Sequence, residues 1–449
     1  MNKNHALISG PMLPAIFRLA GPAVLMMILQ GTYNFIDTYF VGFLGAESLA
    51  GISTGGFILW MTFALAHLFG VGVSAKVARR IGEQNREEAD RTAARGVVYA
   101  FFGAVLIALP LYFFMPLLFN LMHAPSAVAQ AGRAYLLPLI IGLPTIFLSF
   151  VLTGIFNAAG DTRTPFMLML LSLAVNALLD PLFIFGLSSF PELGIAGAAL
   201  ATVVSRLLWL VLAWRQLRRR DSAIALARHG RLGLSLKDLS EVIRIGAPKA
   251  ATGVLFSAVY MALTRITADY GTPNIAALRI GHMYEGFSFF TALGFSIAAA
   301  TLVGQNLGAG KPDRAARAAW LTGGMVFALT TGVGFVFRFG ASELAGIFST
   351  DPAVVSAGAT YLMILAWSQP FMGIEIVMEG SFSGAGNTLP PMLIQLPLTI
   401  LRYPAALLLA YSAGLGVAGV WWAISGSSVI KGLLMMWWFQ QRRWVHTKV

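Results

Sequence analysis

The chain repeats its pattern of glycines and prolines at a fixed offset of 226 residues over most of its length. The matching pairs are Pro22 and Pro248, Gly45 and Gly271, Gly82 and Gly308, Gly154 and Gly380, Gly160 and Gly386, and Pro165 and Pro391. Near the end the register shifts, and Gly194 to Gly197 matches Gly416 to Gly419 at an offset of 222. Glycine and proline set bends and close approaches of the backbone, so the shared spacing predicts one fold made twice.

The composition places this repeated fold in a membrane. The chain is 57% hydrophobic and 11% charged, with a mean hydropathy of +0.75. A soluble domain carries about 25% charged residues. The net charge of +12 comes in short basic clusters between apolar runs. This distribution favours contact with the lipid bilayer and argues against nucleic acid as a partner.

Residue usage excludes several kinds of chemistry. There is no cysteine, and the six histidines are scattered, so the sequence offers no disulfide and no metal-ligand spacing. It also has no paired nucleophile and base and no phosphate-binding loop, so we expect neither an enzyme nor a cofactor. No small-residue cleavage site follows the first apolar run, which we therefore expect to remain as a membrane helix.

Twelve apolar runs reach the length of about 20 residues that a membrane helix needs. They cover approximately 14–42, 49–77, 94–118, 132–156, 165–186, 194–214, 245–268, 275–303, 317–339, 355–379, 390–412 and 416–439. Lys and Arg gather after the even-numbered runs, whereas the opposite loops carry few of them. Because basic loops stay in the cytoplasm, this asymmetry predicts that both termini are cytoplasmic.

The twelve runs divide into two sets of six. We expect an all-α polytopic membrane protein with twelve transmembrane helices in two pseudo-symmetric six-helix lobes, residues 1–214 and 245–449. The polar linker 215–244 joins the lobes, and we expect it to lie along the cytoplasmic surface with a short helix around 236–242. Membrane transporters are often built from two such repeats around a shared substrate site.

Carboxylates inside the apolar runs are the first functional candidates, because an ionisable side chain in a membrane is costly. Asp37 lies deep in the first run. Asn176 and Asp180 share one face of a helix, and Pro181 has no N–H for the carbonyl of Ala177. This group of oxygens suits a proton or a small hard cation such as Na⁺. For both acids the alternative is a local structural hydrogen bond.

Proline is the candidate hinge of the first run. Pro22 precedes Asp37 by about four helical turns and cannot donate to the carbonyl of Arg18. Pro248 is its equivalent in the seventh run. The alternative is a kink without a functional role, since proline is common in membrane helices.

The second half carries a different polar set. Leu263 stands where the repeat would place a second copy of Asp37. The ionisable residues present instead are Arg265, Arg279, His282, Glu285, Glu375, Glu379 and Arg402. Glu375 and Glu379 are four residues apart, so their like charges repel unless one is protonated or a cation is near. We favour an internal ion-pair network in which Arg279 or Arg402 pairs with these glutamates.

Aromatic and methionine side chains are frequent in both halves. Stacking, cation–π contacts and flexible thioethers suit a flat lipophilic cation. The candidate lining residues of a substrate cavity are Tyr33, Phe57, Trp60, Met61, Tyr260, Met261, Met283, Tyr284 and Phe287. Taken singly, each is better explained as facing lipid or packing between helices, and only the set is suggestive.

Several motifs resemble those of the multidrug and toxic compound extrusion (MATE) transporters, over essentially the whole chain. They are Ile36-Asp37-Thr38 with the upstream Pro22, Ala159-Gly160-Asp161-Thr162, segment 176–186 (NALLDPLFIFG) and segment 303–310 (VGQNLGAG). The Asn176, Asp180 and Pro181 group looks like the branch named for the DNA-damage-inducible transporter. The resemblance implies an antiporter with two lobes around a V-shaped cavity and bending of the first helix at Pro22. It also implies a cation-coupling site at Asp37, Asn157, Asn176, Asp180 and Thr202.

The expected function is export of lipophilic, cationic drugs and toxic compounds across the inner membrane of a prokaryote. A monomer would exchange them for H⁺ or Na⁺, with no metal apart from Na⁺ at the coupling site. The alternative is a flippase for lipid-linked saccharides of the same superfamily, which would need several cationic residues to hold a pyrophosphate. Arg265, Arg279 and Arg402 lie in one half only, which disfavours the flippase.

Overall fold

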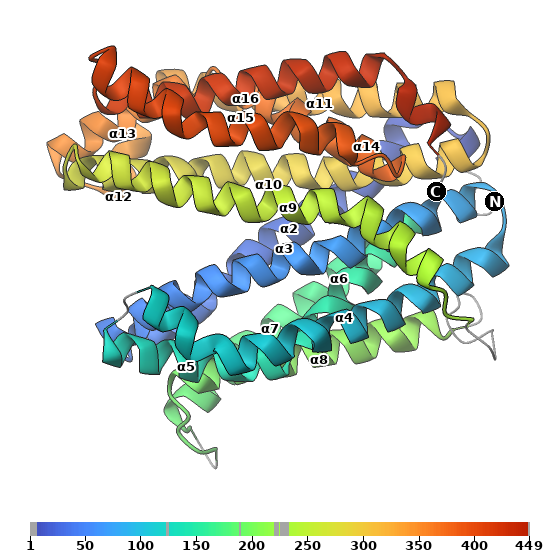
Figure 1. Cartoon of the computed structure of the whole chain (residues 1–449), viewed down its shortest axis with the longest axis horizontal. Coiled ribbons are helices and arrows are strands. Elements are labelled where there is room, and N and C mark those ends of the chain that lie inside the picture. The colour runs from blue at the N-terminus through green and yellow to red at the C-terminus, as the bar shows by residue number, and fades with distance from the viewer. Residues whose placement is uncertain (1–6, 123–124, 188–189, 220–223, 225–232, 448–449) are drawn as a thin grey trace. The chain divides into compact units, whose positions relative to one another are not determined.

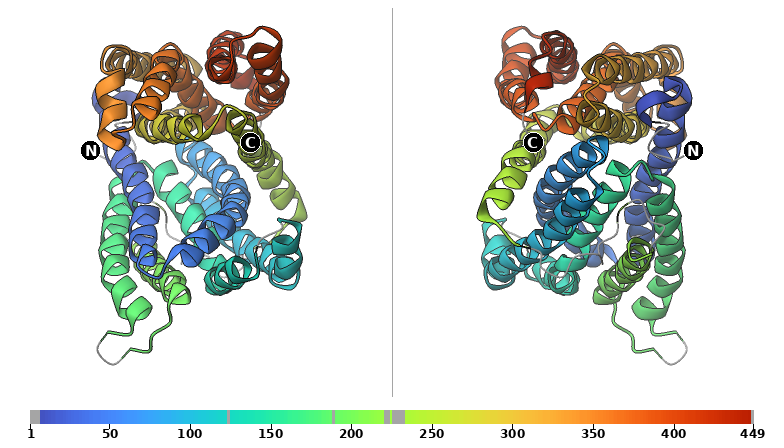
Figure 2. Two further views of the ribbon diagram at one scale, coloured as in Figure 1. Left: turned by 90° about the vertical axis from the view of Figure 1, so that its left-hand side faces the viewer. Right: turned by 90° about the vertical axis from the view of Figure 1, so that its right-hand side faces the viewer.

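The computed structural model describes residues 7–122, 125–187, 190–219, 224 and 233–447, without the side chains of Asn34, Ala46, Phe57 and Leu121. Over these residues the chain forms helices and no strand (Figure 1, Figure 2). The first half contains α2 (Met12–Gly42), α3 (Ala46–Gly82), α4 (Arg86–Leu121), α5 (Ser126–Ile141), α6 (Leu143–Ala158), α7 (Arg163–Phe185) and α8 (Ile195–Leu217). The second half contains α9 (Leu236–Ala268), α10 (Thr272–Gly308), α11 (Pro312–Phe339), α12 (Ala341–Phe348), α13 (Pro352–Leu365), α14 (Gln369–Gly384), α15 (Leu389–Leu407), the π-helical turn η1 (Leu408–Ser412), α16 (Val417–Gln440) and the 3₁₀ turn η2 (Arg443–His446).

Two of the expected membrane spans are broken. In the described chain, 10 helices are long and apolar enough to cross a membrane, and two bent helix pairs bring the spans to 12. The pairs are α5 with α6 and α13 with α14, each bent by 55°. Pro144 and Pro370, themselves 226 residues apart, stand in the first turn of α6 and α14. Proline has no N–H to continue the hydrogen bonding of the preceding helix, which explains a break at the same place in both halves.

The repeat predicted from glycine and proline is present in the backbone. Gly160 and Gly386 adopt φ angles of 77° and 74°, a left-handed conformation that other residues rarely take. A Cβ atom at Gly154 would lie 2.9 Å from a backbone oxygen of α3, and one at Gly380 would lie 2.5 Å from a backbone oxygen of α10. Both halves therefore use glycine for the same turn and the same close helix contact.

The chain divides into two compact units. The N-unit is Leu25–Ala250, and the C-unit is Met1–Val24 together with Ala251–Val449. Both boundaries fall inside a helix, α2 and α9, and each follows the helix's proline by two residues. The boundaries are also 226 residues apart, so α2 and α9 each begin in one unit and end in the other.

The start of α2 belongs to the packing of the C-unit. Ile16 and Leu19 are fully buried in a core shared with α10, α11 and α14. The side chains of Asn306 and Lys311 donate hydrogen bonds of 3.3 Å and 3.0 Å to carbonyl groups just before α2. Apolar burial and these polar contacts together fix the beginning of the first helix.

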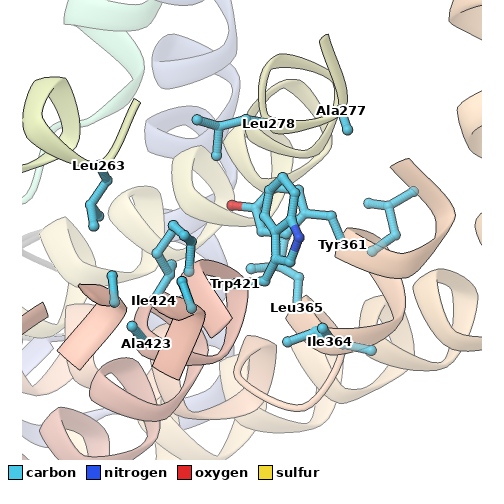
Figure 3. Packing of buried hydrophobic residues seen from close by; sticks show 14 of the residues in the cluster. Leu263, Ala277, Leu278, Tyr361, Ile364, Leu365, Trp421, Ala423 and Ile424 are labelled. Carbon is cyan, nitrogen blue, oxygen red and sulfur yellow. The ribbon is translucent and has the colours of Figure 1, made fainter. Parts of the chain in front are cut away.

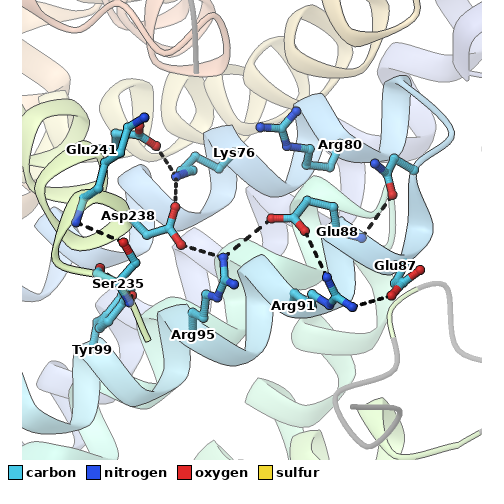
Figure 4. Close-up of polar contacts among 12 residues, drawn as sticks. Lys76, Arg80, Glu87, Glu88, Arg91, Arg95, Tyr99, Ser235, Asp238 and Glu241 are labelled. Atoms are coloured by element: carbon cyan, nitrogen blue, oxygen red, sulfur yellow. Dashed lines mark hydrogen bonds and ion pairs between the residues drawn. The ribbon is translucent and has the colours of Figure 1, made fainter. Parts of the chain in front are cut away.

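The start of α9 is held in the N-unit by a cluster of ion pairs, here called the α9 clamp and formed by Lys76, Arg95, Asp238 and Glu241 (Figure 4). Lys76 Nζ lies 3.4 Å from Asp238 Oδ1 and 2.5 Å from Glu241 Oε2. Arg95 donates to the other oxygen of Asp238. The hydroxyl of Tyr99 donates to the carbonyl that precedes α9, at 2.9 Å.

Helix α9 also touches α3 at backbone level. A Cβ atom on Gly246 would lie 1.8 Å from the carbonyl oxygen of Leu68. The short helix expected at 236–242 and the seventh span are one continuous helix, because the clamp and this contact hold the polar first turns in helical register. Residues 220–223 and 225–232 of the expected linker lie outside the described residues.

Two large buried rings of the C-unit lie in a core to which α9, α10, α13 and α16 contribute (Figure 3). Tyr361 and Trp421 are fully buried, with ring centroids 4.2 Å apart. Leu263 and Leu278 pack against the same cluster. Leu263, the counterpart of Asp37, is thus a core residue, and the C-unit has no copy of that carboxylate.

Candidate functional site

Three helices of the N-unit bring a carboxylate pair together. Asp37 on α2 accepts a hydrogen bond of 3.0 Å from the hydroxyl of Thr202 on α8. On α7, the amide nitrogen of Asn176 donates to Asp180 at 3.3 Å. Asp37 also lies within interaction range of Asn176 and Asp180. All four residues are buried, so four of the five residues suggested for cation coupling form one group, here called the Asp37–Asp180 group.

Several oxygens of this group have no hydrogen-bond partner. Asp37 Oδ1, Asn176 Oδ1 and Asp180 Oδ2 are buried and unpaired with respect to the described residues. An unsatisfied buried polar atom costs about 1–3 kcal/mol, and more if charged. Two carboxylates in a low dielectric also resist simultaneous ionisation. A proton or a small hard cation would relieve both costs, so the donor set fits H⁺ or Na⁺.

Asn157, the fifth suggested residue, is buried near the C-terminal end of α6. Helix α6 packs against α8, which carries Thr202, and touches α7 more weakly. Its role in cation coupling remains a prediction from the family resemblance.

Sequence reasoning missed Ser172, Ser205 and Arg206, and it named their neighbour Tyr33 only as a candidate lining residue of a substrate cavity. The hydroxyl of Tyr33 hydrogen-bonds to Ser205 and lies 3.3 Å from the hydroxyl of Ser172. The guanidinium of Arg206 lies 5.2 Å from the centre of the Tyr33 ring. Arg206 follows Thr202 by one helical turn, and its position inside an apolar run was the signal that could have identified it. It is a cation close enough to act electrostatically on Asp37.

The proposed hinge and the carboxylate lie on one helix. Pro22 is inside α2, which is continuous from Met12 to Gly42. Pro22 belongs to the C-unit and Asp37 to the N-unit. The helix therefore connects the two units between its proline and its acid.

The aromatic and methionine residues suggested for a substrate cavity differ in their exposure. Within the set, the exposed side chains are Trp60, Met61, Met261, Met283 and Phe287. Tyr33 is buried in the N-unit, whereas the hydroxyl of Tyr284 donates to a carbonyl of α12 at 2.9 Å. The side chain of Phe57 lies outside the described part of the chain. The exposed members lie on α3 of the N-unit and on α9 and α10 of the C-unit.

Glu375 in the C-unit has a partner that was not expected. Lys431 Nζ on α16 lies 3.0 Å from Glu375 Oε1, and the two side chains are 7% and 5% exposed. The amide of Gln395 donates to the same oxygen at 3.2 Å. Lys431 was overlooked although a lysine inside an apolar run is itself a functional signal.

The expected pairing of Arg279 or Arg402 with the glutamates is wrong. Arg402 donates to the hydroxyls of Ser427 and Ser428 at 2.5 Å and 3.0 Å, and its guanidinium lies 5.6 Å from the centre of the Tyr260 ring. Arg279 is exposed and makes no ion pair within the described chain. The reason is that Lys431 reaches Glu375 from the neighbouring helix, while hydroxyls and rings surround Arg402.

The other two glutamates of the second-half polar set, Glu285 and Glu379, differ in burial. Glu285 on α10 is half-buried and forms no hydrogen bond with a described residue, and Glu379 on α14 is buried. Among the residues that the structure describes, no group of three or more His, Cys, Asp or Glu side chains is arranged to hold a metal ion.

Comparison with known proteins identifies a membrane transporter. A family model described as MatE matches residues 22–182 and 248–408, and thus fits the chain twice at the offset of the repeat. The chain belongs to the MatE family, whose members are transporters and not enzymes. This finding confirms the resemblance seen in the motifs.

Relatives and solved structures agree over nearly the whole chain. The probable multidrug resistance protein NorM of Thermotoga maritima is 29% identical over 437 residues, covering 96% of this chain and 92% of that protein. A FAD transporter of Shewanella oneidensis is 28% identical over 442 residues, covering 96% and 95%. A crystal structure of a MATE protein in the bent conformation has a TM-score of 0.91 at 24% identity, covering 98% and 97%. The expected fold class, twelve membrane helices in two lobes, is therefore confirmed.

Proposed function

We propose that this protein is an antiporter that exports lipophilic cationic compounds in exchange for H⁺ or Na⁺ by alternating access. It acts as a monomer in a prokaryotic inner membrane, with both termini in the cytoplasm and without a cofactor. The Asp37–Asp180 group, with its three unpaired buried oxygens, carries the proposal. The multidrug resistance protein among the relatives supports the class of substrate.

The coupling step follows from the charge of this group. A ligand shifts a conformational equilibrium only by binding one state better than the other. H⁺ or Na⁺ at Asp37 and Asp180 removes their mutual repulsion and supplies a partner for the unpaired oxygens. The cation therefore favours the conformation in which the group is closed.

Helix α2 transmits this change. Its acid lies in the N-unit and its proline in the C-unit, and a helix bends most easily where proline removes a hydrogen bond. Cation binding at Asp37 favours a bent α2, and release of the cation favours a straight one. Bending at Pro22 reshapes the substrate cavity and releases the substrate outward.

The test is efflux from proteoliposomes under separately imposed H⁺ and Na⁺ gradients, with a fluorescent lipophilic cation as the probe. We expect at least one of the two gradients, imposed alone, to drive uphill movement of the probe. No uphill movement is expected when both gradients are collapsed. Equal probe movement with and without the gradients would contradict the antiport.

A second candidate substrate is an anionic flavin dinucleotide. Arg402 is buried and forms no ion pair with a carboxylate of the described chain, and one relative is a FAD transporter. A buried guanidinium without an anionic partner suits a phosphate. If this candidate is correct, the wild type moves FAD under a gradient, and Arg402→Gln loses FAD transport while it still moves the lipophilic cation. Equal FAD transport by both proteins would exclude Arg402 as the phosphate-binding group.

A further inference from the structure

The N-unit has a hollow on the side of α4, α6 and α8. Helix α6 packs against both α4 and α8, and the three helices line an open groove of about 480 Å³. Ligand pockets in proteins measure about 300–1,000 Å³. Phe101 and Phe102 line it from α4, Leu152 from α6, and Val211 and Trp214 from α8. None of these residues belongs to the Asp37–Asp180 group.

Among the described residues that line this groove, Arg215 is the one with a charged side chain, and it lines the groove with apolar atoms only. It follows Trp214 at the C-terminal end of α8 and is exposed. It forms no hydrogen bond or ion pair with any residue that the structure describes, whereas Arg80 and Arg95 of the same unit are paired. The groove is therefore apolar, and Arg215, a cation without a partner among the described residues, lies at its end.

We propose that the groove binds one acyl chain of an anionic phospholipid and that Arg215 holds its phosphate. An acyl chain buries apolar surface along the phenylalanines and leucines, and the tryptophan lies where an aromatic ring meets a lipid head group. The charge selects the occupant. A lipophilic cation is repelled by Arg215, and a zwitterionic lipid brings no net charge to it. A lipid with a net negative charge can place its acyl chain against the apolar residues and its charged head group beside Arg215.

The experiment measures binding of phosphatidylglycerol and phosphatidylethanolamine to the full-length protein by native mass spectrometry from detergent. One basic residue near a membrane surface contributes about 1 kcal/mol to binding of anionic lipid, which corresponds to about five-fold in affinity. We expect the tightest phosphatidylglycerol site to weaken about five-fold in Arg215→Gln. Arg218→Gln, at the same helix end but outside the groove, is the matched control and should change the affinity less than two-fold.

A second pair of variants tests the apolar part. Val211→Trp fills the groove and should remove the tight phosphatidylglycerol site, while Val204→Trp, exposed on the same helix outside the groove, should retain it. Thermal unfolding of all four variants checks that they fold. Wild-type affinity in both Arg215→Gln and Val211→Trp overturns the proposal. Equal binding of the two lipids by the wild type, or displacement of the lipid by a lipophilic cation, overturns the assignment of the occupant.

Discussion

The buried pair of Glu375 and Lys431 gives the sharpest prediction for stability. The nitrogen and oxygen are 3.0 Å apart and both side chains are almost completely buried. In Lys431→Met, Glu375 keeps only the hydrogen bond from Gln395, so its charge is buried without a counter-ion. Breaking such a pair costs about 3–5 kcal/mol, whereas replacing both partners with residues of similar volume is often close to neutral. Glu375→Gln alone should cost a similar amount, because it leaves the lysine unpaired.

A double-mutant cycle measures this interaction directly. The wild type, the two single variants and Glu375→Gln/Lys431→Met are compared by thermal unfolding in one detergent at one scan rate. We expect each single variant to lose about 3–5 kcal/mol and the double variant to lie near the wild type. The coupling energy is then the sum of the two single effects, about 6–10 kcal/mol. Asp313→Asn is the control, since its ion pair with Arg442 is exposed and contributes about 0–1 kcal/mol. Additive single effects, or single variants as stable as the wild type, would show that Glu375 and Lys431 do not form a stabilising buried ion pair.

Three further predictions concern α2 and α9. Gly246→Ala should destabilise the protein by more than about 2 kcal/mol, because its Cβ would lie 1.8 Å from a carbonyl oxygen of α3. The control Gly324→Ala has open space around its Cβ and should stabilise the protein by roughly 0.5–1 kcal/mol. Thermal unfolding measures both effects. Asp238→Asn should expose α9 near its start to limited proteolysis, because two basic residues lose their shared partner, and unchanged cleavage would mean that the clamp does not hold α9. Pro22→Ala should lower gradient-driven efflux at normal expression by restoring a helical hydrogen bond and stiffening α2, and unchanged efflux would remove the hinge from the mechanism.

Much of the fold could be predicted from the sequence because it depends on local signals. Apolar length gives the spans, and the spacing of glycine and proline gives the repeat. The repeated proline, Pro144 in the first half and Pro370 in the second, marks the breaks of two spans. Hydropathy alone treats each of these spans as continuous. The extent of α9 was not predictable in this way, since its first turns are polar and are held by Lys76 and Arg95 from distant parts of the chain.

The polar sites were harder to predict than the spans. The i,i+4 spacing of Asn176 and Asp180 places both on one face of α7, but it does not show that Asp37 lies opposite them. Arg206 and Lys431 were visible as charges inside apolar runs, yet only the packing of helices reveals what they contact. Glu375 shows this limit most clearly. Its partner Lys431 is 56 residues away in the sequence, and hydropathy alone gives no reason to prefer Lys431 over Arg402 as that partner.

The most direct test of the coupling site is transport by Asp37→Asn and Asp180→Asn in proteoliposomes, with Asp313→Asn as the control carboxylate. Asn mimics the neutral acid but cannot exchange a proton or hold Na⁺ as a carboxylate does. We expect both variants to bind the lipophilic cation but to fail to move it uphill under H⁺ or Na⁺ gradients, while the control transports at the wild-type rate. Uphill export at the wild-type rate by both variants would show that the N-unit is not the coupling site and would direct attention to Glu285, Glu375 and Glu379.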